Sequence, residues 1–194
     1  LRAWADDVVA VIDALAGSDE RAVVVGHAFG NRVARMTAAA HPDRVAAVAL
    51  LACGGLVPPA PAVGAALFGV FDETVDRAAH LAAVRTAFFA PTHDPAVWEH
   101  GWYPAVAAAQ AAATRATPTS EWWLAGSAEV LVVQPDDDVV AVAENAHQLV
   151  GQLGARGRMV TVADAGHALL PEQPEVVASV LLDWLGSGTA AQVC

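Results

Sequence analysis

The stretch AVVVGHAFG, residues 22–30, decides the fold because it carries the chain directly from a strand into a helix. It opens on an apolar run without alternation, which is typical of a parallel strand covered on both faces. After the junction, apolar side chains recur at helical spacing as far as Ala40. Gly26 and Gly30 flank the junction, and small residues there allow a sharp turn that lifts the side chain of Ala28 above the sheet.

Both neighbours of this stretch fit a layered fold. Residues 41–43, His-Pro-Asp, end the helical pattern, and residues 45–51 form a second apolar run. Upstream, residues 4–15 carry apolar side chains at helical spacing, which indicates a surface helix on the core. A strand, a helix and a strand in this order predict a parallel sheet with a right-handed crossover.

The chain changes character in the middle and then returns to the same rhythm. Prolines interrupt the segment after Cys53, and alanine-rich helical pieces then alternate with aromatic residues. The predicted elements beyond this segment are strands at 130–133 and 159–162, a helix at 142–153 and a last helix from Pro171.

These patterns predict one α/β domain with an insertion. The 194 residues, 56% of them hydrophobic, suffice for a single buried core. We expect a mostly parallel sheet flanked by helices, built from residues 1–55 and 129–194. Residues 56–128 are expected to form an inserted helical cap.

At the junction the sequence resembles the α/β-hydrolase superfamily. Residues 26–30, Gly-His-Ala-Phe-Gly, match the G-x-S-x-G nucleophile elbow, and specifically the G-H-S-x-G form of ester-hydrolase-like and lyase-like members. The resemblance covers nearly the whole chain. It also implies about four strands before the first helix, so we expect that an upstream part of the fold is missing.

Two further family landmarks follow in the required order. Residues 135–138, Pro-Asp-Asp-Asp, match the G-x-x-D turn that carries the family's acid, with proline in place of glycine. This alignment makes Asp138 the acid, with Asp137 as the nearby competitor. Gly166-His167, followed by Ala-Leu-Leu and Glu-Gln-Pro-Glu, matches the turn that carries the family's histidine.

The resemblance assigns roles to four positions. His167 is implied as the general base, with Asp138 holding its tautomer and stabilising the imidazolium. The amide of Phe29 is implied as an oxyanion donor. Ala28 occupies the nucleophile position with a methyl group, so no acyl-enzyme can form there. Loss of the nucleophile from a serine triad costs on the order of 10⁶ in turnover.

Three explanations of Ala28 stay open at this stage. It is an engineered serine-to-alanine change, the mark of a natural pseudoenzyme or binding domain, or part of a lyase-type enzyme that uses His167 and Asp138 for proton transfer without covalent catalysis. The resemblance implies that the chain is by ancestry a hydrolase of small carboxylic-ester-type substrates. The departures from family residues at Asn31, Pro135 and Val142 favour a natural variant.

Other polar and aromatic residues have competing readings. The cap aromatics either line an apolar substrate pocket or hold the cap helices to the sheet, and the substrate-binding candidates are Trp98, Trp102, Trp122 and Trp123. His27 is expected to pack beside the turn and Cys53 to act as a small buried hydrophobe. The cap histidines lack the tight spacing of a metal-binding motif, so we expect neither metal nor cofactor.

The amino-acid composition limits the classes of partner that the protein is expected to bind. A formal charge of −11 repels nucleic acid and anionic membranes, and no segment has the length and apolarity of a membrane span, so the expected partner is a small molecule. Cys53 and Cys194 show no paired spacing, so we expect free thiols in a cytoplasmic protein and no disulfide. Leu1 leads directly into a helix with no signal-peptide pattern.

Overall fold

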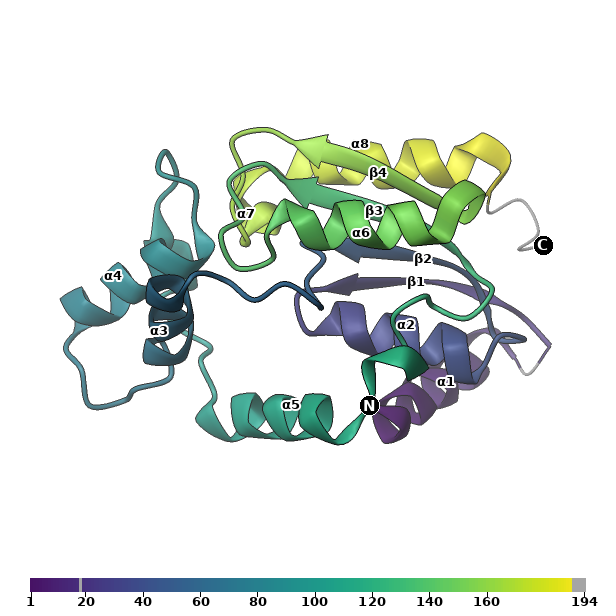
Figure 1. The fold of residues 1–194 in the computed structure, drawn as a ribbon, viewed down its shortest axis with the longest axis horizontal. Coiled ribbons are helices and arrows are strands. Elements are labelled where there is room, and N and C mark those ends of the chain that lie inside the picture. The colour runs from purple at the N-terminus through teal and green to yellow at the C-terminus, as the bar shows by residue number, and fades with distance from the viewer. Residues whose placement is uncertain (18, 190–194) are drawn as a thin grey trace.

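The computed structural model describes residues 1–17 and 19–189, and it contains the predicted parallel sheet (Figure 1). Its four strands lie in the order β1-β2-β3-β4, and every neighbouring pair is parallel. The strands are β1 (Ala22–His27), β2 (Val45–Leu51), β3 (Glu129–Pro135) and β4 (Gly157–Val162). The prediction of an α/β fold with a parallel sheet flanked by helices is confirmed.

Helices cover both faces of this sheet, as the alternation of β2 shows. Val48 and Leu50 face a core cluster shared with α1 (Arg2–Ala16), α2 (Gly30–Ala40) and α6 (Ala143–Leu153). Ala47, Ala49 and Leu51 face the opposite cluster, which α7 (Leu169–Glu172) and α8 (Pro174–Trp184) complete. Because both faces are covered, β2 and β3 need no polar face, and their apolar runs follow from that.

The last helix begins later than the sequence suggested. Pro171 lies inside the single turn α7, and α8 starts at Pro174. Both prolines suit the first turn of a helix, because the missing N–H of proline would have no partner there. The sequence alone therefore did not decide which proline begins the last helix. The short elements η3 (Gly154–Arg156) and η4 (Leu185–Thr189) complete this part of the fold.

The edge strand β1 is less protected than its neighbours. The side chains of β2 and β3 that form the two clusters are at most 2% exposed, whereas Val25 in β1 is 50% exposed. Only β2 is hydrogen-bonded to β1 among the described strands. Strand β1 is therefore one edge of the described sheet, and β4 is the other.

The helical insertion lies beyond the carboxyl ends of the strands (Figure 1). It contains α3 (Pro61–Gly69), α4 (Arg77–Phe88), α5 (Pro104–Ala116) and the short turns η1 (Pro95–Trp98) and η2 (Thr119–Glu121). Helix α5 leads back toward the core, where Arg32 of α2 donates a 2.8 Å hydrogen bond to Thr114. None of the described helices is long and apolar enough to cross a membrane.

Strand register brings four loops to one place. His27 pairs with Leu51, Leu51 pairs with Val133, and Pro135 pairs with Val162, so the carboxyl ends of the four strands are level. The loops that follow them therefore leave from the same edge of the sheet. This edge is where open α/β sheets place their sites.

Candidate active site

The turn between β1 and α2, here called the elbow, is strained at its centre. Ala28 has φ +52°, in the left-handed region that alanine rarely adopts. A Cβ on Gly26 would lie 2.4 Å from the carbonyl oxygen of Gly30, so the two ends of the turn touch backbone to backbone. Only glycine fits at position 26, because any side chain there would open the turn.

Asn31 ties this turn to the end of the neighbouring strand. Its side chain is fully buried and its amide nitrogen donates to the carbonyl oxygens of Leu51 and Ala52, at 2.8 and 2.9 Å. The backbone N–H of Ala28 also donates to Leu51, at 3.3 Å. The departure from the family's glycine at position 31 thus supplies two hydrogen bonds that hold the elbow against β2.

Asp138 and His167 form a buried pair at the same edge. The Nδ1 atom of His167 lies 2.9 and 3.1 Å from the two carboxylate oxygens of Asp138, and the residues are 5% and 6% exposed. Asp138 also accepts from the backbone N–H groups of Val140 and Ala141, at 2.9 and 2.7 Å. Asp137 has an exposed side chain, and its backbone N–H donates to Ala165. The structure therefore pairs His167 with Asp138.

The electrostatics of this pair define the tautomer of the imidazole. Burial acts to raise the pKa of Asp138, but the neighbouring His167 and the N–H groups of Ala141 and Val140 outweigh it and lower the pKa below its ordinary value. Because a carboxylate only accepts, Nδ1 of His167 carries the hydrogen. The other ring nitrogen, Nε2, then holds a lone pair in the neutral imidazole, which is the protonation pattern of a general base.

His27 links the elbow to this pair. Its Nε2 donates to the backbone carbonyl of His167 at 2.7 Å, and the two rings lie 5.3 Å apart. Burial and the neighbouring His167 lower the pKa of His27 to about 4, so the ring is neutral at physiological pH. The structural contact predicted for His27 is present, and its partner is the backbone of the histidine loop.

Phe29 stands where the resemblance places an oxyanion donor. It is the N-cap of α2, so its backbone N–H belongs to the first-turn group that has no partner within the helix. Its ring packs edge-on against Trp4 of α1, with centroids 4.9 Å apart. The helix N-terminus also carries positive partial charge, which favours a negatively charged oxygen.

The four predicted substrate-binding tryptophans divide into two groups. Trp98 and Trp102 form a cap cluster with Phe88, whose ring lies 5.7 Å from that of His167, and Trp98 lies 6.2 Å from His27. Trp122 and Trp123 are at most 5% exposed in the core cluster under α2. Their contacts belong to the core, and the substrate-binding role remains a prediction for all four.

The pair of core tryptophans encloses a buried cation that the sequence did not flag. The guanidinium of Arg35 lies 4.6 and 4.9 Å from the ring centroids of Trp122 and Trp123, and the residue is fully buried. It donates to the carbonyl oxygens of Asn31 and Gly54. Ring faces and carbonyl groups thus take the place of a carboxylate.

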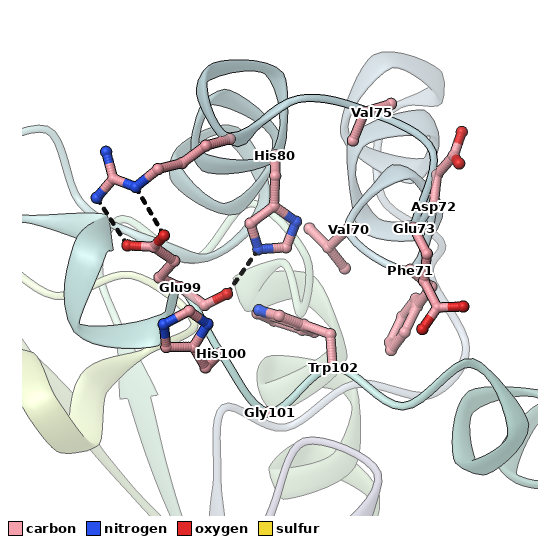
Figure 2. Close-up of a pocket in the computed structure, with 11 residues that line it drawn as sticks. Val70, Phe71, Asp72, Glu73, Val75, His80, Glu99, His100, Gly101 and Trp102 are labelled. Atoms are coloured by element: carbon pink, nitrogen blue, oxygen red, sulfur yellow. Dashed lines mark hydrogen bonds and ion pairs between the residues drawn. The ribbon is translucent and has the colours of Figure 1, made fainter.

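A separate cavity of about 300 Å³ lies within the cap (Figure 2). Its lining includes the apolar side chains of Trp102, Val70 and Phe71, together with Arg77, which donates two hydrogen bonds of 2.6 and 2.7 Å to Glu99. His80 donates through Nε2 to the Glu99 carbonyl at 3.0 Å. No cluster of three or more potential metal ligands occurs within the described ranges.

Two predictions concern cysteines. Cys53 is a free, fully buried thiol after β2, and burial raises its pKa despite the nearby Arg35, so it stays protonated and unreactive. Cys194 lies outside the described residues, so its predicted free state stays a prediction.

Comparisons with known proteins identify the family and the fold. A model of the alpha/beta hydrolase family matches residues 1–180. The esterase RhEst1 from Rhodococcus sp. has a TM-score of 0.74 at 22% identity, over 95% of this chain and 71% of the esterase. A thermophilic esterase from Thermogutta terrifontis has a TM-score of 0.73 at 22% identity, over 95% and 71% respectively.

E-2-(acetamidomethylene)succinate hydrolase shares the fold with a TM-score of 0.67 at 19% identity, over 94% of this chain and 72% of that enzyme. At these identities the structural matches establish the fold alone. No curated protein matches the sequence.

Proposed function

Because the chain belongs to the alpha/beta hydrolase family, we propose that it is a hydrolase of small carboxylic esters by ancestry, in which His167 and Asp138 act on a water molecule directly. The observation that carries the proposal is the buried pair between these side chains, 2.9 Å apart at the carboxyl edge of the sheet. Such a pair has a clear use when Nε2 of His167 must take up and return a proton.

The chemistry follows from the groups present. His167 removes a proton from water, and the resulting hydroxide attacks the ester carbonyl. The tetrahedral oxyanion is stabilised by the backbone N–H of Phe29 at the start of α2. Collapse expels the alcohol, which takes the proton back from His167, and Asp138 stabilises the imidazolium throughout. Ala28 contributes no bond, so no acyl-enzyme is formed.

Restoring the missing oxygen tests the site most directly. We expect Ala28→Ser to react with a fluorophosphonate probe that leaves the parent protein unlabelled, because the new hydroxyl stands on an intact elbow. Ester turnover should rise by several orders of magnitude, up to about 10⁶-fold, the reverse of what nucleophile removal costs a serine triad. Labelling is read by mass spectrometry and turnover with p-nitrophenyl acetate.

Two controls separate the components. The double variant Ala28→Ser, His167→Ala should stay unlabelled, because the serine then lacks its base. In the parent, His167→Ala should abolish the residual turnover that the water mechanism predicts. A folded Ala28→Ser protein that neither labels nor hydrolyses the ester would contradict the assignment of the three positions.

A ligand-binding domain without chemistry is the second candidate, and the methyl group of Ala28 is the observation that favours it. On this alternative a small ligand raises the thermal stability of the parent, and His167→Ala leaves that stabilisation unchanged. In either case we propose residues 1–55 and 129–194 as the core, residues 56–128 as the cap, and Trp98 as the cap residue that contacts the ligand.

A further inference from the structure

A second buried carboxylate, Glu172, stands beside the histidine loop, defined here as residues 163–168. One of its oxygens accepts from the backbone N–H of Gly166 at 2.7 Å, and the other accepts from the backbone N–H of Ala90, also at 2.7 Å. The residue is 7% exposed. One side chain therefore joins two backbone segments that are far apart in the sequence, and one of them carries His167.

The segment on the other side of this carboxylate is residues 88–93, here called the cap strap, which leaves the end of α4. The carbonyl oxygen of Phe88 accepts from the N–H of Ala168 at 2.8 Å. Farther along, His93 donates through Nε2 to the carbonyl of Asp164 at 2.9 Å. The cap strap thus follows the histidine loop along its length, with the Glu172 contacts between these two bonds.

Packing leaves the histidine loop little freedom against the cap strap. A Cβ on Gly166 would lie 2.6 Å from the carbonyl oxygen of Phe88 and 2.8 Å from the backbone nitrogen of Ala90. The Phe88 ring also lies 5.7 Å from the ring of His167. A shift of the cap strap would therefore move the backbone next to the imidazole.

We propose that Glu172 is a positioning residue, which fixes the imidazole of His167 against Asp138 by clamping the histidine loop to the cap strap. The side chain of His167 is held by Asp138, and its backbone carbonyl accepts from His27. Glu172 supplies a further fixed point, at the residue immediately before His167. The cap thereby acts on the geometry of the base from a place that no substrate needs to touch.

Opposing influences act on the carboxylate of Glu172, and their net effect raises its pKa. Burial raises the pKa of Glu172, while the N–H groups of Ala90 and Gly166 act in the opposite direction. The charged or titratable neighbours are His93, which favours the carboxylate, and Asp164, which disfavours it. Donor hydrogen bonds to an ionised carboxylate are about twice as strong as those between neutral groups.

The test compares Glu172→Gln with Glu175→Gln, an exposed position that undergoes the same change in charge. The glutamine keeps one acceptor and turns an NH₂ group toward a backbone N–H, so the clamp loses one side. By NMR we expect the amide of Gly166 or Ala90 to exchange roughly 10- to 100-fold faster. The Nδ1 proton of His167 should broaden or disappear, and Glu175→Gln should change neither signal.

Unchanged exchange of the β3 amides shows that the variant is folded. If Glu172→Gln does not fold, Glu172→Asp keeps the charge but is too short to reach both amides, and it is measured in the same way. The parent protein supplies an independent test. If the amide of Gly166 or Ala90 is not protected from hydrogen exchange in the parent, the proposal is overturned. A folded Glu172 variant with an unaltered His167 Nδ1 proton also overturns it.

Only the effect on turnover rests on the proposed function. In an Ala28→Ser background, Glu172→Gln should lower kcat about 10-fold or more and leave KM nearly unchanged, because the base and not the substrate is displaced. If Ala28→Ser is inactive while the NMR changes occur, the proposed function fails and the clamp stands. If Ala28→Ser is active and the addition of Glu172→Gln leaves its kcat unchanged, the proposed function stands and the clamp fails.

Discussion

The elbow and the loops that carry Asp138 and His167 meet at one edge of the sheet, but the elbow carries only a methyl group at position 28. Ala28 is strained, with φ +52°, and a backbone contact excludes any side chain at Gly26. The loops retain a buried carboxylate and imidazole together with all of the carboxylate's hydrogen bonds.

The difference lies in what holds each part. The elbow is shaped by backbone packing and by Asn31, so its geometry is independent of the side chain at position 28. The shape of the loops depends on side chains, because the acid turn folds around the carboxylate of Asp138. The side chain at position 28 can therefore change without loss of fold, whereas loss of the Asp138 carboxylate removes structure as well. The presence of the Asp138–His167 pair can therefore reflect a role in catalysis or a role in stability. The two roles must be measured separately.

The largest effect on stability is expected from Asp138→Ala. It leaves the N–H groups of Val140 and Ala141 and the Nδ1 of His167 without their acceptor inside the protein. We expect a loss of about 3–5 kcal/mol in the free energy of unfolding, the range typical of removing one partner from a buried pair. Urea denaturation at pH 7 measures it.

Asp137→Ala is the matched control, because its side chain is exposed and only its backbone takes part in the turn. It should change stability by less than about 0.5 kcal/mol. Equal losses in the two variants would mean that the turn, and not the buried carboxylate, holds this loop together.

The sequence predicted those parts of the molecule that depend on local pattern. Apolar runs and helical spacing predicted the strands, their parallel pairing and the elbow. Each of these features is encoded within about twenty residues. The choice of Asp138 over Asp137 came from the spacing of a family turn. The structure now pairs Asp138 with a histidine 29 positions away.

Other features depend on contacts that no local pattern encodes. Arg35 has the position of an ordinary helix residue, and only the packed fold places it beneath two tryptophans 87 and 88 positions later. Glu172 follows the histidine turn in the sequence, but its second partner, Ala90, is 82 positions away. The sequence places Glu172 five residues after His167, and this spacing does not indicate that Ala90 is its second partner.

His27 joins the two compared regions, so its titration shows whether they are coupled. Its pKa is lowered to about 4 in the folded protein, against an ordinary value of 6.5. As pH falls below 6.5 the unfolded chain takes up the proton first, so stability is complete above about pH 6.5 and is lost between there and about pH 4. At about 1.4 kcal/mol per pKa unit, the loss amounts to as much as about 3 kcal/mol.

Replacement of His27 by asparagine should remove this dependence, while His147→Asn, at an exposed site, should keep it. The measurement is urea denaturation at pH 7 and pH 4.5. A parent protein whose stability is flat across this interval would contradict the burial of His27 beside His167, which is the cause of its lowered pKa.

The smallest effect is expected at the two glycines of the elbow, and it differs in sign between them. Gly26→Ala places a methyl group 2.4 Å from the backbone oxygen of Gly30, which cannot rotate away, so overpacking should cost about 1–3 kcal/mol. Gly30→Ala meets no atom within 4 Å and lies at the start of α2, so helix propensity should stabilise the protein by about 0.5–1 kcal/mol. Thermal unfolding of both variants measures the two changes in stability. If Gly26→Ala proves as harmless as Gly30→Ala, the backbone contact between residues 26 and 30 does not shape the elbow.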